Sequence, residues 1–155
     1  GMLLPVEHVS IGTAVFDRSP ETVWRVLTDL DGMPLWRSDL TTLERLPNHA
    51  GKTVWREISR EGVQVLELLR EEPPYWLVMQ SAHAGRSTYP MRSFELISID
   101  RGTRVTMTVR AEVFNPFRRV LVRLDPGRPA VERFLHDLDH RLNVNRRQVA
   151  ADGLQ

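Results

Sequence analysis

Apolar and polar residues alternate with a period of two along much of this chain, which is the pattern of β-strands with one buried face. The clearest example is the segment 103–113, in which Val105, Met107 and Val109 alternate with charged or hydroxyl side chains. Similar patterns predict further strands over residues 9–16, 40–46, 53–59, 63–70, 75–82 and 88–99. Because strands follow one another with little helical signal from residue 51 to residue 114, we expect an antiparallel sheet.

Helical patterns lie on both sides of this strand-rich region. Ser19 is a good N-cap and Pro20 suits the first helical position, so a helix is expected to begin here and to end before Asp31 and Gly32. One further short turn is expected over residues 35–37.

The C-terminal region has its own helix signals. Asn115 and Pro116 provide a cap and a first-position proline, and apolar residues at helical spacing continue on both sides of a break at 125–129. Two helical pieces, or one interrupted helix, are therefore expected. The end of the chain is polar, so we expect one domain over residues 2–145 and a frayed tail over 146–155. This order of elements predicts an α+β fold in which a curved sheet holds a long C-terminal helix across its concave side, with a cavity between them.

Composition narrows the functional classes. The 155 residues are 41% hydrophobic and 26% charged, as expected for one globular domain. The 21 basic and 20 acidic side chains leave a net charge of +1, so the field that attracts nucleic acid is weak and no nucleic-acid partner is expected. The chain has no cysteine, which removes disulfides and thiolate chemistry. It also lacks an apolar run of about 20 residues, so we expect no membrane span and a cytoplasmic location.

Several short motifs, taken in their order along the chain, resemble the START-like helix-grip superfamily, also called SRPBCC and typified by the birch-pollen-allergen fold. The matching segments are residues 19–24, 30–36, 71–74, 94–96, 102–106 and 115–116. The likeness is greatest to the polyketide cyclase/dehydrase and lipid-transport group. It implies a sheet of about seven strands wrapped around the C-terminal helix, two short helices after the first strand, and an apolar cavity. Members of the superfamily include cyclases, lipid carriers, receptors and protein-binding domains, so the resemblance leaves the activity open.

Glu67 is the first candidate for chemistry in such a cavity. It shares a strand face with Val63, Val65 and Leu69. If that face lines the cavity, burial raises the pKa of the carboxyl group toward acid–base use. If the face is wet, Glu67 pairs with a cross-strand arginine instead.

Arg92 is the second candidate, because Phe94 and Leu96 on its strand face look like core residues. An inward guanidinium group could hold a ligand carboxylate or phenolate through two parallel hydrogen bonds. The alternative is that Arg92 reaches solvent or pairs with Glu57 or Glu67.

His83 and Tyr89 flank a polar connection and are further candidates for proton transfer, with exposed loop side chains as the alternative. The sequence does not distinguish which of Glu67, His83 and Tyr89 would be catalytic. The residues expected to bind a ligand are mostly apolar or aromatic: Met33, Trp36, Trp55, Arg92, Phe94, Met107, Phe134 and Leu138.

His136 and His140 have the i, i+4 spacing of a helical metal site, but no glutamate lies between them as in the metalloprotease motif. We therefore expect no metal and no cofactor. Neither a nucleophile elbow nor a glycine-rich phosphate loop is present in the sequence.

Three functions follow from these patterns. The first is binding of a hydrophobic or aromatic small molecule, such as a lipid or polyketide-like compound, between the sheet and the C-terminal helix. The second is an enzyme of the cyclase/dehydrase or hydrolase type that uses the same cavity, and the third is a protein-interaction module. The oligomeric state is left open, a homodimer included.

Overall fold

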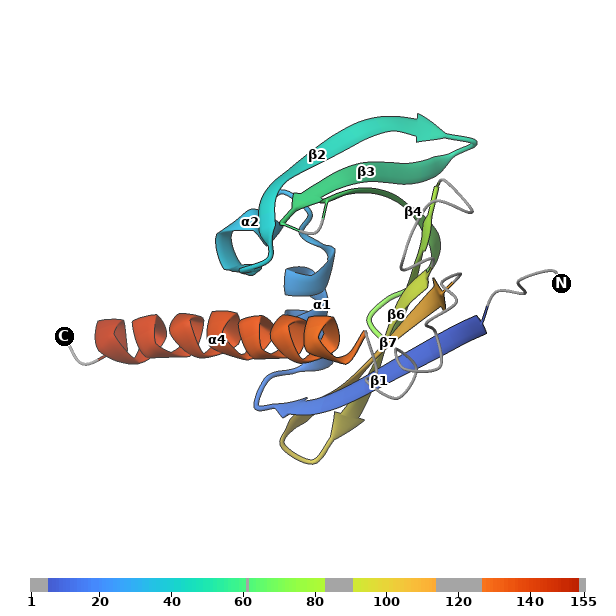
Figure 1. The fold of residues 1–155 in the computed structure, drawn as a ribbon. Helices are drawn as coiled ribbons and strands as arrows, with labels where there is room; N and C mark the ends of the chain where they lie inside the picture. Colours follow the sequence, from blue (N-terminus) through green and yellow to red (C-terminus); the bar gives the residue numbers. More distant parts are fainter. Residues whose placement is uncertain (1–5, 61, 83–90, 114–126, 154–155) are drawn as a thin grey trace, which may run out of the picture.

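The computed structural model describes residues 6–60, 62–82, 91–113 and 127–153, and its ribbon is drawn in Figure 1. The sheet is formed by strands β1 (Val6–Phe16), β2 (Leu40–His49), β3 (Lys52–Ser59), β4 (Gly62–Glu72), β5 (Trp76–Ser81), β6 (Met91–Ile99) and β7 (Gly102–Val113). The helices among the described residues are α1 (Pro20–Thr28), α2 (Met33–Trp36) and α4 (Arg128–Gly153).

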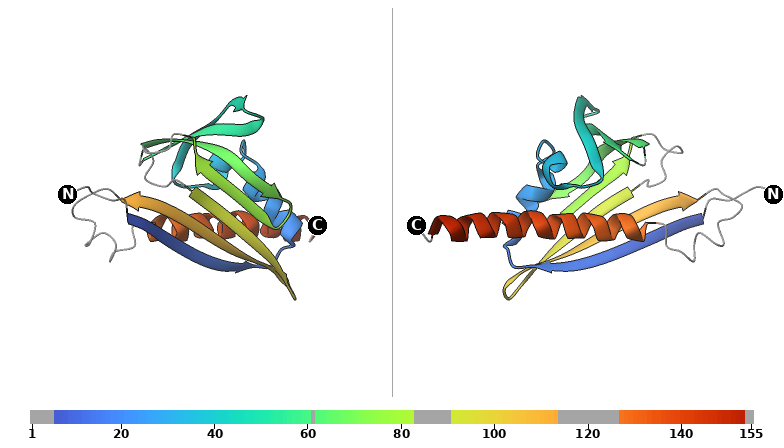
Figure 2. Two further views of the ribbon diagram at one scale, coloured as in Figure 1. Left: turned by 90° about the vertical axis from the view of Figure 1, so that its right-hand side faces the viewer. Right: turned by 60° about the vertical axis from the view of Figure 1, so that its left-hand side comes forward.

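The seven strands form one antiparallel sheet in the order β1-β7-β6-β5-β4-β3-β2. From β2 to β7 each strand pairs with its neighbour along the chain, and β7 also pairs with β1. Figures 1 and 2 show the sheet curving around one side of α4, whose C-terminal turns extend past the strands. The predicted α+β helix-grip fold of about seven strands is thereby confirmed.

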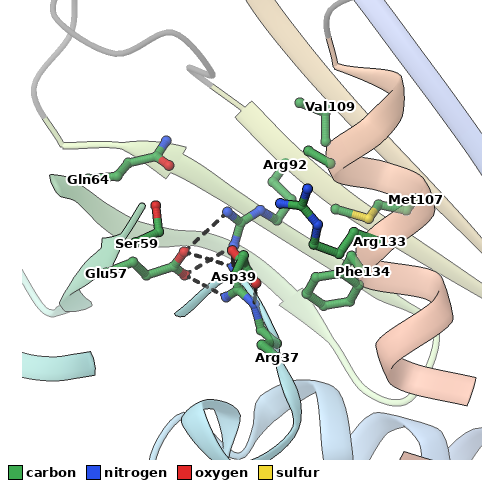
Figure 3. A pocket seen from close by; sticks show the side chains of 11 residues that line it. Arg37, Asp39, Glu57, Ser59, Gln64, Arg92, Met107, Val109, Arg133 and Phe134 are labelled. Carbon is green, nitrogen blue, oxygen red and sulfur yellow. Dashed lines mark hydrogen bonds and ion pairs between the residues drawn. The ribbon is translucent and has the colours of Figure 1, made fainter. Parts of the chain in front are cut away.

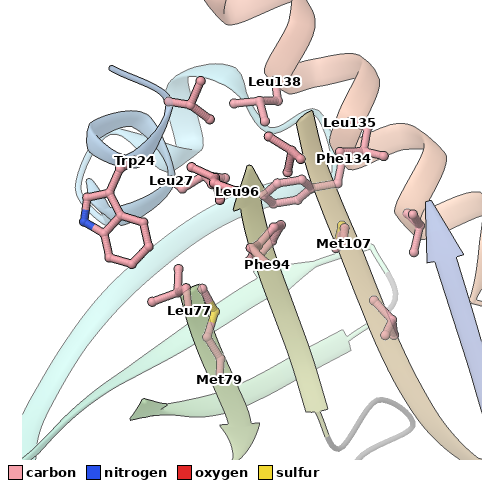
Figure 4. Packing of buried hydrophobic residues seen from close by; sticks show 14 of the residues in the cluster. Trp24, Leu27, Leu77, Met79, Phe94, Leu96, Met107, Phe134, Leu135 and Leu138 are labelled. Carbon is pink, nitrogen blue, oxygen red and sulfur yellow. The ribbon is translucent and has the colours of Figure 1, made fainter. Parts of the chain in front are cut away.

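The core lies between the concave face of the sheet and the inner side of α4 (Figure 4). Phe94, Met107 and Leu138 are each at most 2% exposed. The helix packs so closely on β1 that a Cβ atom added at Gly12 would collide with the side chain of Val131. That close approach fixes the N-terminal half of α4 against the sheet.

The strand expected over residues 40–46 is longer in the structure, because β2 continues through Pro47 to His49. The turn is made by Ala50 and Gly51, with φ angles of 51° and 78°, as a two-residue hairpin of the I′ type requires. β2 lies at the edge of the sheet and its register shifts between Leu46 and His49, so a proline is tolerated there.

The C-terminal helix also differs in extent from the prediction. α4 begins at Arg128, inside the expected break at 125–129, and it is helical as far as Gly153. The earlier helical piece predicted from Asn115 and Pro116 lies outside the described residues. No helix in the described ranges is both long and apolar enough to cross a membrane.

Candidate functional site

A small cavity of about 70 Å³ lies on the concave face of the sheet beside the start of α4 (Figure 3). We call it the inner pocket. One wall is apolar and consists of Met107, Val109, Ala130 and Phe134. The other wall is polar and consists of Arg37, Asp39, Glu57, Ser59, Gln64, Arg92 and Arg133. Such a division suits a ligand with an apolar body and a polar end.

The centre of the polar wall is a buried ion cluster of Arg37, Glu57 and Arg92, whose side chains are 3%, 5% and 12% exposed. Arg92 donates from Nη1 and Nη2 to the two carboxylate oxygens of Glu57 at 3.1 and 3.3 Å. Arg37 donates from Nη2 to Glu57 Oε1 at 3.2 Å, and the indole N–H of Trp55 donates to Oε2 at 3.0 Å. Arg37 also holds Asp39, with its Nη2 atom 2.8 Å from Oδ2. The Glu57 carboxylate is therefore surrounded by donors.

These contacts decide the ionisation of the cluster. Burial alone would raise the pKa of Glu57, but the guanidinium groups of Arg92 and Arg37 reverse the effect and hold the pKa well below its usual range. Burial alone would lower the pKa of Arg37, but Glu57 and Asp39 outweigh it and raise the pKa. Glu57 and Arg37 are therefore both ionised at neutral pH.

Local structure explains how these side chains meet. Trp55 and Glu57 are two residues apart on β3, so both point to the concave face, where Trp55 pairs with Leu66 and Glu57 with Gln64 of β4. Arg37 follows the last turn of α2 and adopts an extended conformation with φ −82° and ψ 112°, which turns the chain toward β2.

The helix α4 fixes the segment that carries Arg37. Asp137 accepts hydrogen bonds from the backbone N–H and the hydroxyl group of Ser38, both at 2.8 Å. The centroid of the Phe134 ring lies 5.2 Å from the Arg37 guanidinium carbon, and the ring packs edge-on against Trp36 with centroids 5.3 Å apart. One face of α4 thus positions both the polar and the apolar wall of the pocket.

The structure brings three of the residues expected to bind a ligand into the inner pocket, namely Arg92, Met107 and Phe134. Arg92 does point inward, but its guanidinium group is held by Glu57, which was the alternative considered for it. The other expected residues pack in or against the core: Met33, Trp55, Phe94 and Leu138 are buried, and Trp36 is half-buried on Phe134. Their contact with a ligand stays a prediction.

Glu67 lies on the opposite face of β4 from the inner pocket. Its neighbour Leu66 is 1% exposed and faces inward, whereas Glu67 pairs with Val54 on the outer face. There it accepts a hydrogen bond from Gln80 and lies 3.9 Å from the Lys52 ammonium nitrogen. The acid–base role expected for Glu67 required the inward face of β4, and Glu67 lies on the outward face.

His83 and Tyr89 lie outside the described residues, so their proposed roles in proton transfer stay predictions. His136 and His140 are both exposed on α4. Within the described ranges, no three His, Asp or Glu side chains gather as a metal ion would require.

The sequence patterns do not single out Arg37, Asp39 or Arg133, and they indicate Glu57 only as a partner of Arg92. The signal available for Glu57 was its place on the same strand face as Trp55. Arg37, Asp39 and Arg133 come from other parts of the chain, and no local pattern links them to β3.

A second, more open cavity of about 300 Å³ adjoins the inner pocket, and we call it the outer pocket. It is lined by Ser38, Asp39, Ser59, Arg60 and Arg133. Asp39, Ser59 and Arg133 belong to both pockets, so the two spaces share one boundary.

Comparison with known proteins agrees with this architecture. Residues 9–143 match the family model described as polyketide cyclase / dehydrase and lipid transport, and the chain belongs to this family. None of the curated proteins compared matches the chain.

Solved structures show the same fold at low sequence identity. A START superfamily protein from Mycobacterium smegmatis has a TM-score of 0.73 and 16% identity, with 88% of this chain and 97% of that chain covered. Norcoclaurine synthase from Thalictrum flavum has a TM-score of 0.71 and 10% identity, covering 94% and 99%. The di-domain ARO/CYC protein BexL has a TM-score of 0.67 and 11% identity, covering 86% of this chain and 49% of that chain.

Proposed function

We propose that the protein binds a hydrophobic or aromatic small molecule, lipid-like or polyketide-like, with its apolar body on the inner-pocket wall and its polar end toward the buried ion cluster. The observation that carries this proposal is the position of the cluster. Arg37, Glu57 and Arg92 are almost fully removed from solvent, yet they face a cavity whose other wall contains Met107 and Phe134.

Energetics support a functional reason for the cluster. Burying ionised groups costs several kcal/mol per ion before pairing, and well-packed apolar residues in their place are often neutral or stabilising. Ligand pockets commonly combine an apolar lining with a few placed polar groups that set orientation. Apolar contact then contributes roughly 25 cal/mol per Å² buried, and the cluster selects the orientation.

The carboxylates of the pocket are paired with arginine, and this pairing favours binding without reaction over catalysis. Among the described residues that line the inner pocket, the carboxyl groups are Asp39 and Glu57, and both are held by arginine. A carboxylate whose pKa is lowered, as in Glu57, is a weak base and is not protonated near neutral pH to serve as an acid. The cyclase/dehydrase alternative needs a proton-transfer group from elsewhere, and similar folds in norcoclaurine synthase and BexL are its support.

Filling the inner pocket tests the proposal. Val109 lies on its wall and is 4% exposed, whereas Thr108, the preceding residue of β7, points to the other face of the sheet. We expect Val109→Phe to abolish the shift in melting temperature that apolar and aromatic ligands cause, because its ring occupies the cavity. Thr108→Phe is the matched control and should preserve that shift.

Two results would contradict the proposal. One is that no compound in a panel of fatty acids, phospholipids and aromatic polyketides stabilises the unmodified protein. The other is that folded Val109→Phe protein binds these compounds as well as the unmodified protein does. A compound that binds and is chemically changed would instead support the enzyme alternative.

A further inference from the structure

The inner pocket contains more positive than negative charge. Three arginines line it, Arg37, Arg92 and Arg133, against the two carboxylates of Asp39 and Glu57. Both carboxylates are already engaged by Arg37 and Arg92. Arg133 therefore carries the positive charge that is not matched by a carboxylate among the described residues of the pocket.

Arg133 has no protein partner in the part of the chain that the structure describes. It is an exposed residue of α4, one position before Phe134, and it makes no hydrogen bond or ion pair with another described residue. Figure 3 shows its side chain directed into the same space as that of Arg92. The charge of Arg92 is paired with Glu57, so the guanidinium group of Arg133 is the one left to pair with an anion in this space.

The outer pocket places a second cation beside Arg133. Arg60, directly after β3, lines this pocket and likewise makes no hydrogen bond or ion pair within the described ranges. The Ser38 hydroxyl already donates to Asp137, and the Ser59 hydroxyl donates to the Gly62 carbonyl oxygen. The one carboxylate of this pocket, Asp39, is held by Arg37 at 2.8 Å. Among the described lining residues, the donors left for an anion at this boundary are the guanidinium groups of Arg60 and Arg133.

We propose that Arg133 and Arg60 bind an anionic group, carboxylate or phosphate, of the ligand whose apolar body occupies the inner pocket. This inference rests on the proposed binding function and names the chemical class of its ligand: an anionic amphiphile. The guanidinium fork matches the paired oxygens of carboxylate and phosphate, and its pairing strengthens next to an apolar wall. Arg92 stays with Glu57 and acts as the inner boundary of the anion site.

A matched pair of probes tests the inference. 2-Naphthoate and 2-naphthamide have the same ring system, and only the first is charged. Titration calorimetry would measure the affinity of both for the unmodified protein, for Arg133→Gln and for Arg104→Gln. Arg104 is an exposed arginine at the other side of the sheet, so its variant carries the same change in net charge away from the pocket.

We expect naphthoate to bind more tightly than naphthamide. Arg133→Gln should weaken naphthoate by about tenfold or more, the loss typical of a charge-assisted hydrogen bond, and leave naphthamide unchanged. Arg60→Gln should act in the same direction, and Arg104→Gln should affect neither probe. Naphthyl phosphate, titrated in parallel, distinguishes a preference for phosphate from one for carboxylate. Because Arg133 is exposed, its replacement by glutamine should leave the melting temperature nearly unchanged.

The outcomes separate this inference from the proposed function. Equal affinity of the two probes, or equal weakening of both by Arg133→Gln, would overturn the anion site and leave the pocket as a binder of neutral compounds. Failure of both probes to bind the unmodified protein would overturn the inference together with the binding function at this pocket.

Discussion

Removing the charge of Glu57 should destabilise the fold more than removing any surface carboxylate. In Glu57→Gln, the nearly isosteric amide keeps the packing but leaves the guanidinium groups of Arg37 and Arg92 without their shared anion. These side chains are 3% and 12% exposed, so water replaces little of the lost interaction. Removing one partner from a buried ion pair costs about 3–5 kcal/mol, against a total stability of about 5–15 kcal/mol for a domain. We expect a loss of about 3 kcal/mol in urea unfolding.

Two further variants make this prediction specific. Glu44→Gln removes an ion pair of similar length, 2.8 Å to Arg56, but both side chains are well exposed, so the cost should stay below about 1 kcal/mol. Adding Arg92→Met to Glu57→Gln should recover part of the loss, because the remaining Arg37 retains Asp39. Two results would contradict this prediction. One is that Glu57→Gln lowers the free energy of unfolding no more than Glu44→Gln does. The other is that adding Arg92→Met to Glu57→Gln lowers it further.

Two other predictions concern the same region. Burial would raise the pKa of Glu57, yet Arg92 and Arg37 lower it, so the stabilisation is complete above the ordinary glutamate pKa of about 4.3 and is lost as the pH falls through the lowered pKa. The difference in unfolding free energy between the unmodified protein and Glu57→Gln should therefore be constant near neutrality and shrink below about pH 4; a difference that grows on acidification would contradict the sign. Asp137→Ala removes the acceptor of both hydrogen bonds from Ser38 and should cost about 1–3 kcal/mol. Amide exchange at Ser38 should accelerate in that variant, and an unchanged rate would show that Asp137 does not fix the segment.

The elements that depend on local pattern were predictable from the sequence. The alternation over residues 103–113 gives β7 its buried Val105 and Met107, and Ser19 caps α1 by accepting a hydrogen bond from the backbone N–H of Thr22 at 3.2 Å. The order of the elements was enough to predict the helix-grip fold.

The composition of the site could not be predicted in the same way. Its charged residues come from the segment after α2, from β3, from β6 and from α4, and only the tertiary fold brings them together. For Glu67 the sequence left the strand face open, because both faces of β4 contain apolar residues and a shift of one position exchanges them. The register between β3 and β4 determines which face Glu67 occupies. Leu66 pairs with the buried Trp55 and faces inward, so Glu67 faces outward.

Native mass spectrometry of the protein purified from its own host, with extraction and identification of any bound compound, tests the central claim most directly. We expect one equivalent of a compound with an apolar or aromatic body and a single anionic group, which Val109→Phe protein prepared in the same way should lack. The contrary result is a protein that is empty in every preparation and whose melting temperature does not shift when lipids or aromatic polyketides are added. That result would contradict a ligand-binding role for the inner pocket.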